Sequence, residues 1–137
     1  MPPVSRVELR TIRKWVERLG YEVVEEDPRM LRITPPEGRR EGVPPFYVQL
    51  AEHWLMLSIL PIFPADRPLA GGTALGLLLL TRDMPIAKFA TGEDGEVVLC
   101  AELPTESLQE VEVTDLIERM VGYVRTLPSR MLGLDYG

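Results

Sequence analysis

The order of periodic segments predicts an α+β domain with a single antiparallel sheet, in the order α-β-β-β-β-α-β-β-α. Three segments carry apolar residues at helical spacing, and shorter ones alternate or are rich in β-branched and aromatic residues. Turns rich in Pro, Gly and Asp join several strand segments, which is typical of antiparallel hairpins. No internal repeat or shift in composition divides the chain, so residues 1–137 are expected to form one domain.

The first helix is predicted over residues 5–19, where apolar side chains recur at helical spacing and arginines fall elsewhere around the axis. Ser5 and Glu8 have the spacing of a capping box, which marks the helix start. Gly20 stands where a left-handed C-terminal cap belongs. Both ends of this helix are therefore indicated by the sequence.

The strands are predicted where the period changes to two, over residues 21–26, 30–34, 46–51, 53–62, 86–91 and 97–103. The segment 53–62 is apolar on both faces, with Trp54 and Met56 on one side and Leu55 and Leu57 on the other. A strand with two apolar faces must be covered twice. We expect the domain's own helices to cover one face, and a partner subunit or a ligand groove to cover the other.

The second helix is predicted over residues 68–81 and is apolar around its whole circumference, which indicates burial on all sides. The closing region after Pro104 is one helix, or two helices broken near residues 111–113. One small domain has too few elements to cover both the second helix and the 53–62 strand. A two-fold homodimer is therefore expected, with interface residues Leu75, Leu78 and Leu79.

Composition narrows the class of partner. The chain has 15 Lys and Arg against 21 Asp and Glu, a net charge of -6, so neither nucleic acid nor an anionic membrane is expected as a partner. The longest apolar stretch, which ends at Leu80, is about half of the ~20 residues that a membrane-spanning helix requires. Nothing near Met1 resembles a signal peptide, and the single Cys100 cannot form an internal disulfide. These features predict a cytoplasmic location.

The basic residues are 13 Arg and 2 Lys, and the chain contains no Asn. Few thermolabile amides and Pro-rich loops are typical of heat-adapted proteins. A GC-rich genome would give the same bias through codon usage, so the composition leaves both origins open.

Residues suited to catalysis are scarce. His53 is the single histidine and adjoins Glu52, and Cys100 lies within a predicted strand, where a thiol packs as a small apolar group. The glycine-rich run 71–76 lacks the Lys and Ser or Thr that a phosphate-binding loop needs. Neither His53 nor Cys100 is accompanied by a pair of ligand residues at the spacing typical of a zinc site. We therefore expect no catalytic residue, no cofactor and no metal.

The layout resembles the type III secretion chaperone-like fold, and in particular the bacterial YbjN-like (sensory transduction regulator) family. The segments that carry the resemblance are Trp15, Leu19-Gly20-Tyr21, Phe46-Tyr47-Val48, Trp54-Leu55-Met56-Leu57, residues 75–80, Met84-Pro85-Ile86-Ala87-Lys88-Phe89, residues 93–99 and Glu102-Leu103-Pro104. The resemblance implies a non-enzymatic, homodimeric cytosolic protein that binds segments of other proteins. The Pro-rich stretch 35–45 departs from the chaperone pattern.

Two classes of function follow. The first is a chaperone-like or regulatory homodimer that binds an extended segment of a partner protein along an exposed strand, with 21–26 as the candidate edge, or in an apolar groove. The partner-binding surface is expected to include Tyr21, Val23, Tyr47, Trp54 and Met56. The alternative is a small-molecule-binding or enzymatic domain with a pocket near Tyr47, His53 and Trp54.

Overall fold

The computed structural model describes residues 7–37, 43–63 and 71–132. Its elements are α1 (Leu9–Arg18), β1 (Glu22–Asp27), β2 (Met30–Thr34), β3 (Phe46–Leu50), β4 (Trp54–Phe63), α2 (Gly71–Arg82), β5 (Lys88–Thr91), β6 (Val97–Pro104) and α3 (Glu110–Leu132). This is the predicted α-β-β-β-β-α-β-β-α order. The six strands form one antiparallel sheet in the order β1-β2-β3-β4-β6-β5, which confirms the fold class.

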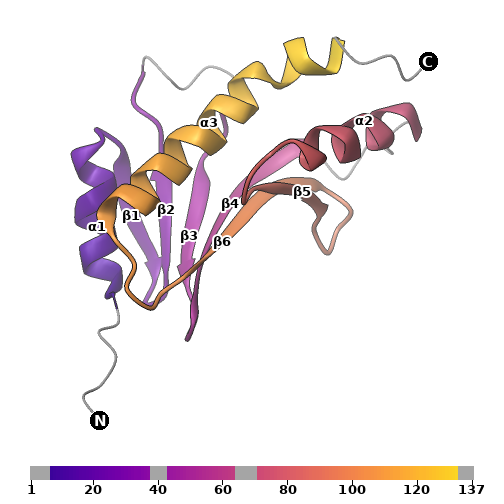
Figure 1. Cartoon of the computed structure of the whole chain (residues 1–137). Coiled ribbons are helices and arrows are strands. Elements are labelled where there is room, and N and C mark those ends of the chain that lie inside the picture. The colour runs from indigo at the N-terminus through magenta and orange to yellow at the C-terminus, as the bar shows by residue number, and fades with distance from the viewer. Residues whose placement is uncertain (1–6, 38–42, 64–70, 133–137) are drawn as a thin grey trace.

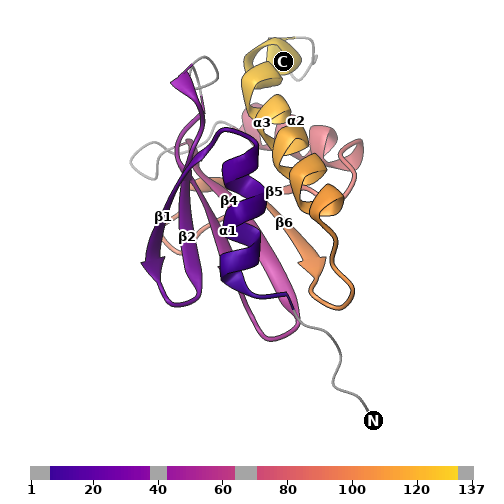
Figure 2. The same ribbon diagram turned by 90° about the vertical axis from the view of Figure 1, so that its left-hand side faces the viewer.

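The described helices lie on one side of the sheet (Figures 1 and 2). The long helix α3 crosses the sheet beside α1, and α2 lies next to α3 and β5. The strand β4 shows the consequence, because Leu55, Leu57 and Ile59 face the helices and are fully buried. Trp54 points the opposite way and keeps 46% of its surface exposed. Both faces of β4 are apolar, but the described helices cover only one.

The helix α1 begins later than predicted. Its first residue is Leu9, and Glu8 occupies the N-cap position without a side-chain hydrogen bond. The sequence predicted that Glu8 lies inside the helix and forms a capping box with Ser5. Glu8 instead precedes the helix and makes no capping hydrogen bond, so this prediction is wrong. Ser5 lies outside the described residues. The predicted C-terminal end is confirmed, since Gly20 has a φ of 90°, a backbone conformation that glycine adopts without strain.

The helix α3 settles the alternative left open by the sequence, because a single helix runs from Glu110 through the region of the expected break. The carboxylate of Glu112 accepts a hydrogen bond from the backbone N–H of Gln109 at 3.0 Å, which supplies half of a capping box. Val113 is fully buried, so tertiary packing holds its β-branched side chain in the helix.

The helix α2 differs most from expectation. Residues 71–82 are helical, and residues 68–70 of the predicted helix lie outside the described part of the chain. Leu77 and Leu80 are buried, but Leu75 and Leu78 are 52% and 66% exposed. The prediction of burial on all sides is thus wrong for the single chain, because the sheet and α3 contact only one side of α2.

We expect Val48→Ala to lower the free energy of unfolding by about 2 kcal/mol, because it deletes two methyl groups from a fully buried side chain and leaves a cavity. The matched control is Val111→Ala on α3, where the valine is 55% exposed and the change should stay within about 0.5 kcal/mol. Urea denaturation of both variants measures the difference. Equal destabilisation would contradict the assignment of the covered face.

Candidate partner-binding surfaces

The face of the sheet opposite the helices forms the first candidate surface, which we call the open sheet face. Its described members include Val24, Tyr47, Trp54, Met56, Ser58 and Cys100. The strand register places Tyr47 and Cys100 on either side of Ser58, while Met56 lies between Gln49 and Glu102. Trp54 lies four residues from Ser58, or about 13 Å at ~3.3 Å per residue. Tyr47, Met56 and Trp54 therefore share a spread-out surface.

Two residues predicted for this surface lie elsewhere. Tyr21 is 3% exposed; its ring packs edge-on against Phe46 at 5.8 Å between centroids, and its hydroxyl donates a hydrogen bond to Glu118 at 3.2 Å. Val23 is 9% exposed and pairs with the buried Ile33. The prediction that Tyr21 and Val23 are accessible is wrong, because this side of β1 faces the helices.

Val24 takes their place on the open sheet face, with 57% of its surface exposed. Sequence reasoning missed it because Val23 and Val24 are adjacent and identical. Alternation shows that they point in opposite directions, but it does not show which of them points toward the helices.

The outer side of α2 forms the second candidate surface. Leu75 and Leu78 lie three residues apart, which places them side by side on the helix, and Leu79 beside them is half-buried. An open hollow of about 210 Å³ adjoins Leu78 between α2 and the strands β5 and β6. Its lining is almost entirely apolar: Ala74, Leu77, Leu78, Phe89, Ala90, Thr91 and Val97.

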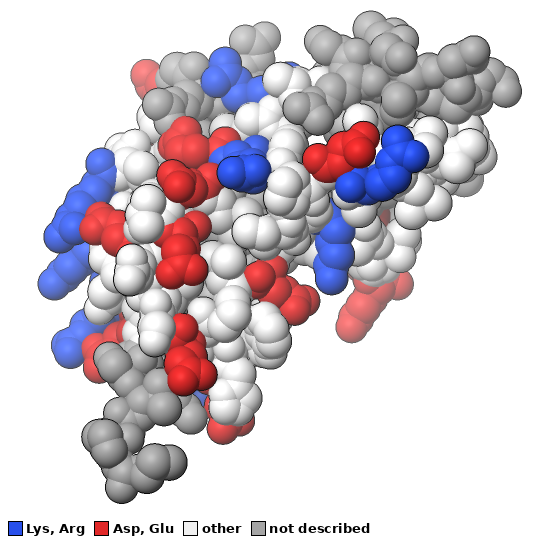
Figure 3. Space-filling model, viewed as in Figure 1, with Lys and Arg blue, Asp and Glu red and all other residues white. Residues whose placement is uncertain are grey.

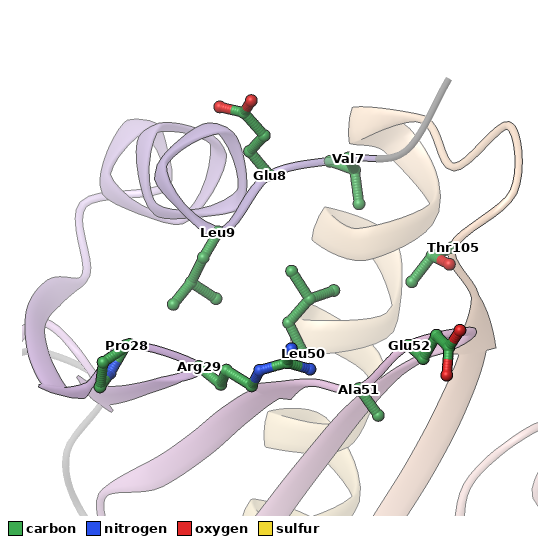
Figure 4. A pocket seen from close by; sticks show the side chains of 9 residues that line it. All are labelled: Val7, Glu8, Leu9, Pro28, Arg29, Leu50, Ala51, Glu52 and Thr105. Atoms are coloured by element: carbon green, nitrogen blue, oxygen red, sulfur yellow. The ribbon is translucent and has the colours of Figure 1, made fainter. Parts of the chain in front are cut away.

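A third surface is a groove beneath the first turn of α1, which the sequence did not predict. Figure 4 shows Leu9 of α1 and Leu50 at the end of β3 directed into the space between the helix and the sheet. Arg29 and Glu52 lie at its margin. The hollow measures about 510 Å³, and a second of about 460 Å³ shares Leu9 in its lining and extends along α1 toward β1. We call the two together the α1 groove.

The α1 groove has no sequence motif because its lining comes from separate segments. These are α1, the β1–β2 turn, the β3–β4 turn and the residue that follows β6. Only the register of the sheet brings them together, so no local pattern indicates the groove.

The surface charges form bands. Figure 3 shows Lys and Arg along the outer margin of α1, with carboxylates beside them toward α3. Three ion pairs join arginines of α1 to carboxylates: Arg10 pairs with Glu8, Arg13 Nε lies 3.0 Å from Glu17 Oε1, and Arg18 Nη1 lies 2.8 Å from Glu110 Oε2. The cations of α1 are therefore partly neutralised by their neighbours.

The residues considered for catalysis are far apart. His53 is exposed in the β3–β4 turn, 3.8 Å from a carboxylate oxygen of Glu52. Cys100 lies opposite Ser58, five residues along β4 from His53, or roughly 16 Å at ~3.3 Å per residue. Burial raises the pKa of the Cys100 thiol, and nearby Lys88 only partly offsets this effect. The thiol therefore stays protonated near neutral pH and is a poor nucleophile.

The alternative expected from the sequence was a small-molecule pocket near three residues at and around the β3–β4 hairpin. The hollows described above are lined by residues other than Tyr47, His53 and Trp54. Among the described residues, no three or more His, Cys, Asp or Glu side chains are grouped to hold a metal ion. None of the helices in residues 7–37, 43–63 and 71–132 is long and apolar enough to cross a membrane.

Comparison with known proteins shows the fold. No protein-family profile matches the chain, and no curated protein sequence matches it. Among solved structures, it is similar to a chain of the heterodimeric ExoU-SpcU complex from the type III secretion system of Pseudomonas aeruginosa, with a TM-score of 0.61 and 22% identity over 84% of this chain and 93% of that chain.

Two further structures agree. YbjN of E. coli, proposed to be a transcription regulator, has a TM-score of 0.58 and 18% identity, over 94% of this chain and 93% of its own. A chain of the HopA1-SchA chaperone-effector complex has a TM-score of 0.59 and 12% identity, over 82% of this chain and 85% of that chain. The chain thus has the YbjN-like, type III secretion chaperone-like fold that the sequence predicted.

We expect Cys100 in the native protein to react slowly with iodoacetamide near neutral pH, because burial raises the pKa of its thiol. The rate should rise as pH increases beyond the usual thiol range. The unfolded chain ionises this thiol at its lower, ordinary pKa. The free energy of unfolding should therefore fall as pH rises from the ordinary pKa toward the raised pKa of the native protein. Mass spectrometry of the alkylated protein, with the urea-unfolded chain as control, measures the rate. Equal native and unfolded rates near neutrality would contradict this prediction.

Proposed function

We propose that this protein is a non-catalytic, chaperone-like or regulatory homodimer of the cytoplasm that binds segments of partner proteins. The observation that carries the proposal is apolar surface left exposed in two places, at Trp54 on the open sheet face and at Leu75 and Leu78 on α2. Exposed apolar surface of this kind is typical of sites where proteins associate. Similarity of fold to chains of the ExoU-SpcU and HopA1-SchA complexes supports a role in binding other proteins.

The homodimer is proposed to form through α2. Burying an exposed leucine side chain contributes about 1.5–3 kcal/mol, and a two-fold axis buries each residue twice. Leu75 and Leu78 would form the centre of the interface with Leu79 at its side, and the adjoining apolar hollow could receive a side chain of the second copy.

The open sheet face is proposed to bind the partner protein, through Tyr47, Trp54 and Met56. Tryptophan and tyrosine combine a large apolar area with a polar atom, and both are enriched where proteins bind one another. The alternative of a small-molecule or enzymatic site near Tyr47, His53 and Trp54 receives less support, because these side chains are spread along the sheet.

We expect Leu78→Glu to convert the dimer to a monomer, because a carboxylate would be desolvated at the interface. Light scattering at micromolar concentration measures the solution mass. Val111→Glu is the matched control, since this exposed valine lies on α3, away from the proposed interface, and its replacement should leave the mass unchanged. A wild-type protein that is a monodisperse monomer would show that the proposed dimer is wrong.

We expect the double variant Trp54→Ser with Met56→Ser to lose most of its protein partners, because it removes the largest apolar side chain of the open sheet face together with its neighbour. Affinity purification from the native cytosol, followed by mass spectrometry, compares this variant with the wild type and with a Val111→Ser control. Retention of the same partners by the double variant would exclude this face as the binding surface.

A further inference from the structure

The strand β5 lies at one edge of the sheet and pairs with β6 on one side only. The backbone N–H of Phe89 donates a hydrogen bond to Thr81 Oγ1 of α2 at 3.2 Å, so this N–H points away from β6. Alternate residues along an antiparallel strand present their N–H groups to the same side. The outward donors of this edge are therefore those of Phe89 and Thr91, together with Ala87 just before the strand.

The outward N–H of Ala87 is also used within the chain. It donates a hydrogen bond to the carbonyl of Pro85 at 2.7 Å, which closes a three-residue turn around Ile86. The φ of Ile86 is 69°, a backbone conformation that β-branched residues rarely adopt. A strained turn thus occupies the start of the edge, and of the three outward donors only Thr91 lacks a partner among the described residues.

The hydroxyl of Thr81 makes two hydrogen bonds at once. It donates to the carbonyl of Leu77 at 2.9 Å, a bond that threonines commonly make within helices. Thr114 of α3 makes the same kind of bond to the carbonyl of Glu110 at 3.0 Å. Thr81 differs because its oxygen also accepts the N–H of Phe89. A hydroxyl offers one donor and two acceptor sites, so the two bonds do not compete.

The hydrogen bond between Thr81 and Phe89 is the single one that joins α2 to the sheet among the described residues. An apolar side chain of the same shape at position 81 would leave the N–H of Phe89 without an acceptor. Unpaired backbone donors on an edge strand form a template for pairing with another chain. The closed state of this edge therefore depends on one hydroxyl group.

We propose that Thr81 closes the β5 edge, and that a second copy of this chain pairs with it, β5 against β5, when this hydroxyl is lost. Two identical antiparallel edges can meet about a two-fold axis, because each copy then offers the other the same groups. Thr81 is a positioning residue: its hydroxyl holds the N–H of Phe89 and contacts no partner itself. The inference goes beyond the proposed function, because it concerns the sheet edge and not the outer side of α2.

The variant Thr81→Val tests the proposal, because valine has the shape of threonine without its acceptor. We expect light scattering at micromolar concentration to give about twice the mass of the wild type, as two copies join edge to edge. Thr81→Ser keeps the hydroxyl and should keep the wild-type mass. The matched control Thr114→Val removes a similar bond within a helix but frees no strand N–H, so its mass should not change. An unchanged mass for Thr81→Val would overturn the proposal.

Amide hydrogen exchange, measured at a concentration too low for association, tests the edge directly. The amide of Phe89 should be protected in the wild type and in Thr81→Ser, and should exchange at least about tenfold faster in Thr81→Val, because local opening then exposes it. The amide of Leu99 on β6 should keep its protection. Unchanged exchange at Phe89, or acceleration spread equally to Leu99, would contradict a role confined to the edge.

The double variant Thr81→Val with Leu78→Glu separates this inference from the proposed homodimer. Leu78→Glu should disrupt contacts through α2 but leave edge pairing intact, so the double variant should still associate. Loss of association in the double variant would show that the larger species forms through α2, which overturns the closed-edge inference and supports the homodimer. A monomeric wild type with an associating Thr81→Val would support the closed edge and count against the proposed homodimer alone.

Discussion

The register between β4 and β6 is the constraint on which the rest of the molecule depends. Leu57 lies opposite Ala101, and Ile59 lies opposite Leu99, so one apolar layer spans the centre of the sheet. The helices on one side of the sheet cover this layer, and its side chains are buried. Because side chains alternate along a strand, a shift of one residue would turn Leu57 to the outside and bring Trp54 and Met56 inward. The register therefore determines which face of the sheet the helices cover.

The same register gives the open sheet face its composition. Residues opposite one another on that side include Tyr47, Ser58 and Cys100, which mix apolar and polar groups. Such a face tolerates water in the single chain, because hydroxyl groups and nearby charges are interspersed among the apolar side chains. Trp54 is the exception, at one end of this face. The partner binding proposed for this face rests on that exposed side chain.

Much of the fold could be predicted from the sequence because periodicity is a local property. The segment 30–34 coincides with β2, and Gly20 ends α1 as expected. What failed depends on tertiary packing. Alternation alone could not reveal which side of β1 faces the helices, so Tyr21 and Val23 were wrongly expected on the accessible side. The apolar circumference of α2 indicated that its side chains should be buried, but not which surface would bury them. The α1 groove brings together segments distant in the chain, and no pattern along the sequence describes that.

The two sheet edges show how the chain limits its own association. At β5, the backbone N–H groups of Phe89 and Ala87 donate hydrogen bonds within the chain, to Thr81 Oγ1 and to the carbonyl of Pro85. These two donors are therefore not available to a strand from another molecule. At β1, carboxylates repel an identical β1 edge from a second copy. The β1 edge thus resists self-pairing by charge, whereas at β5 the chain itself already uses backbone donors of the edge.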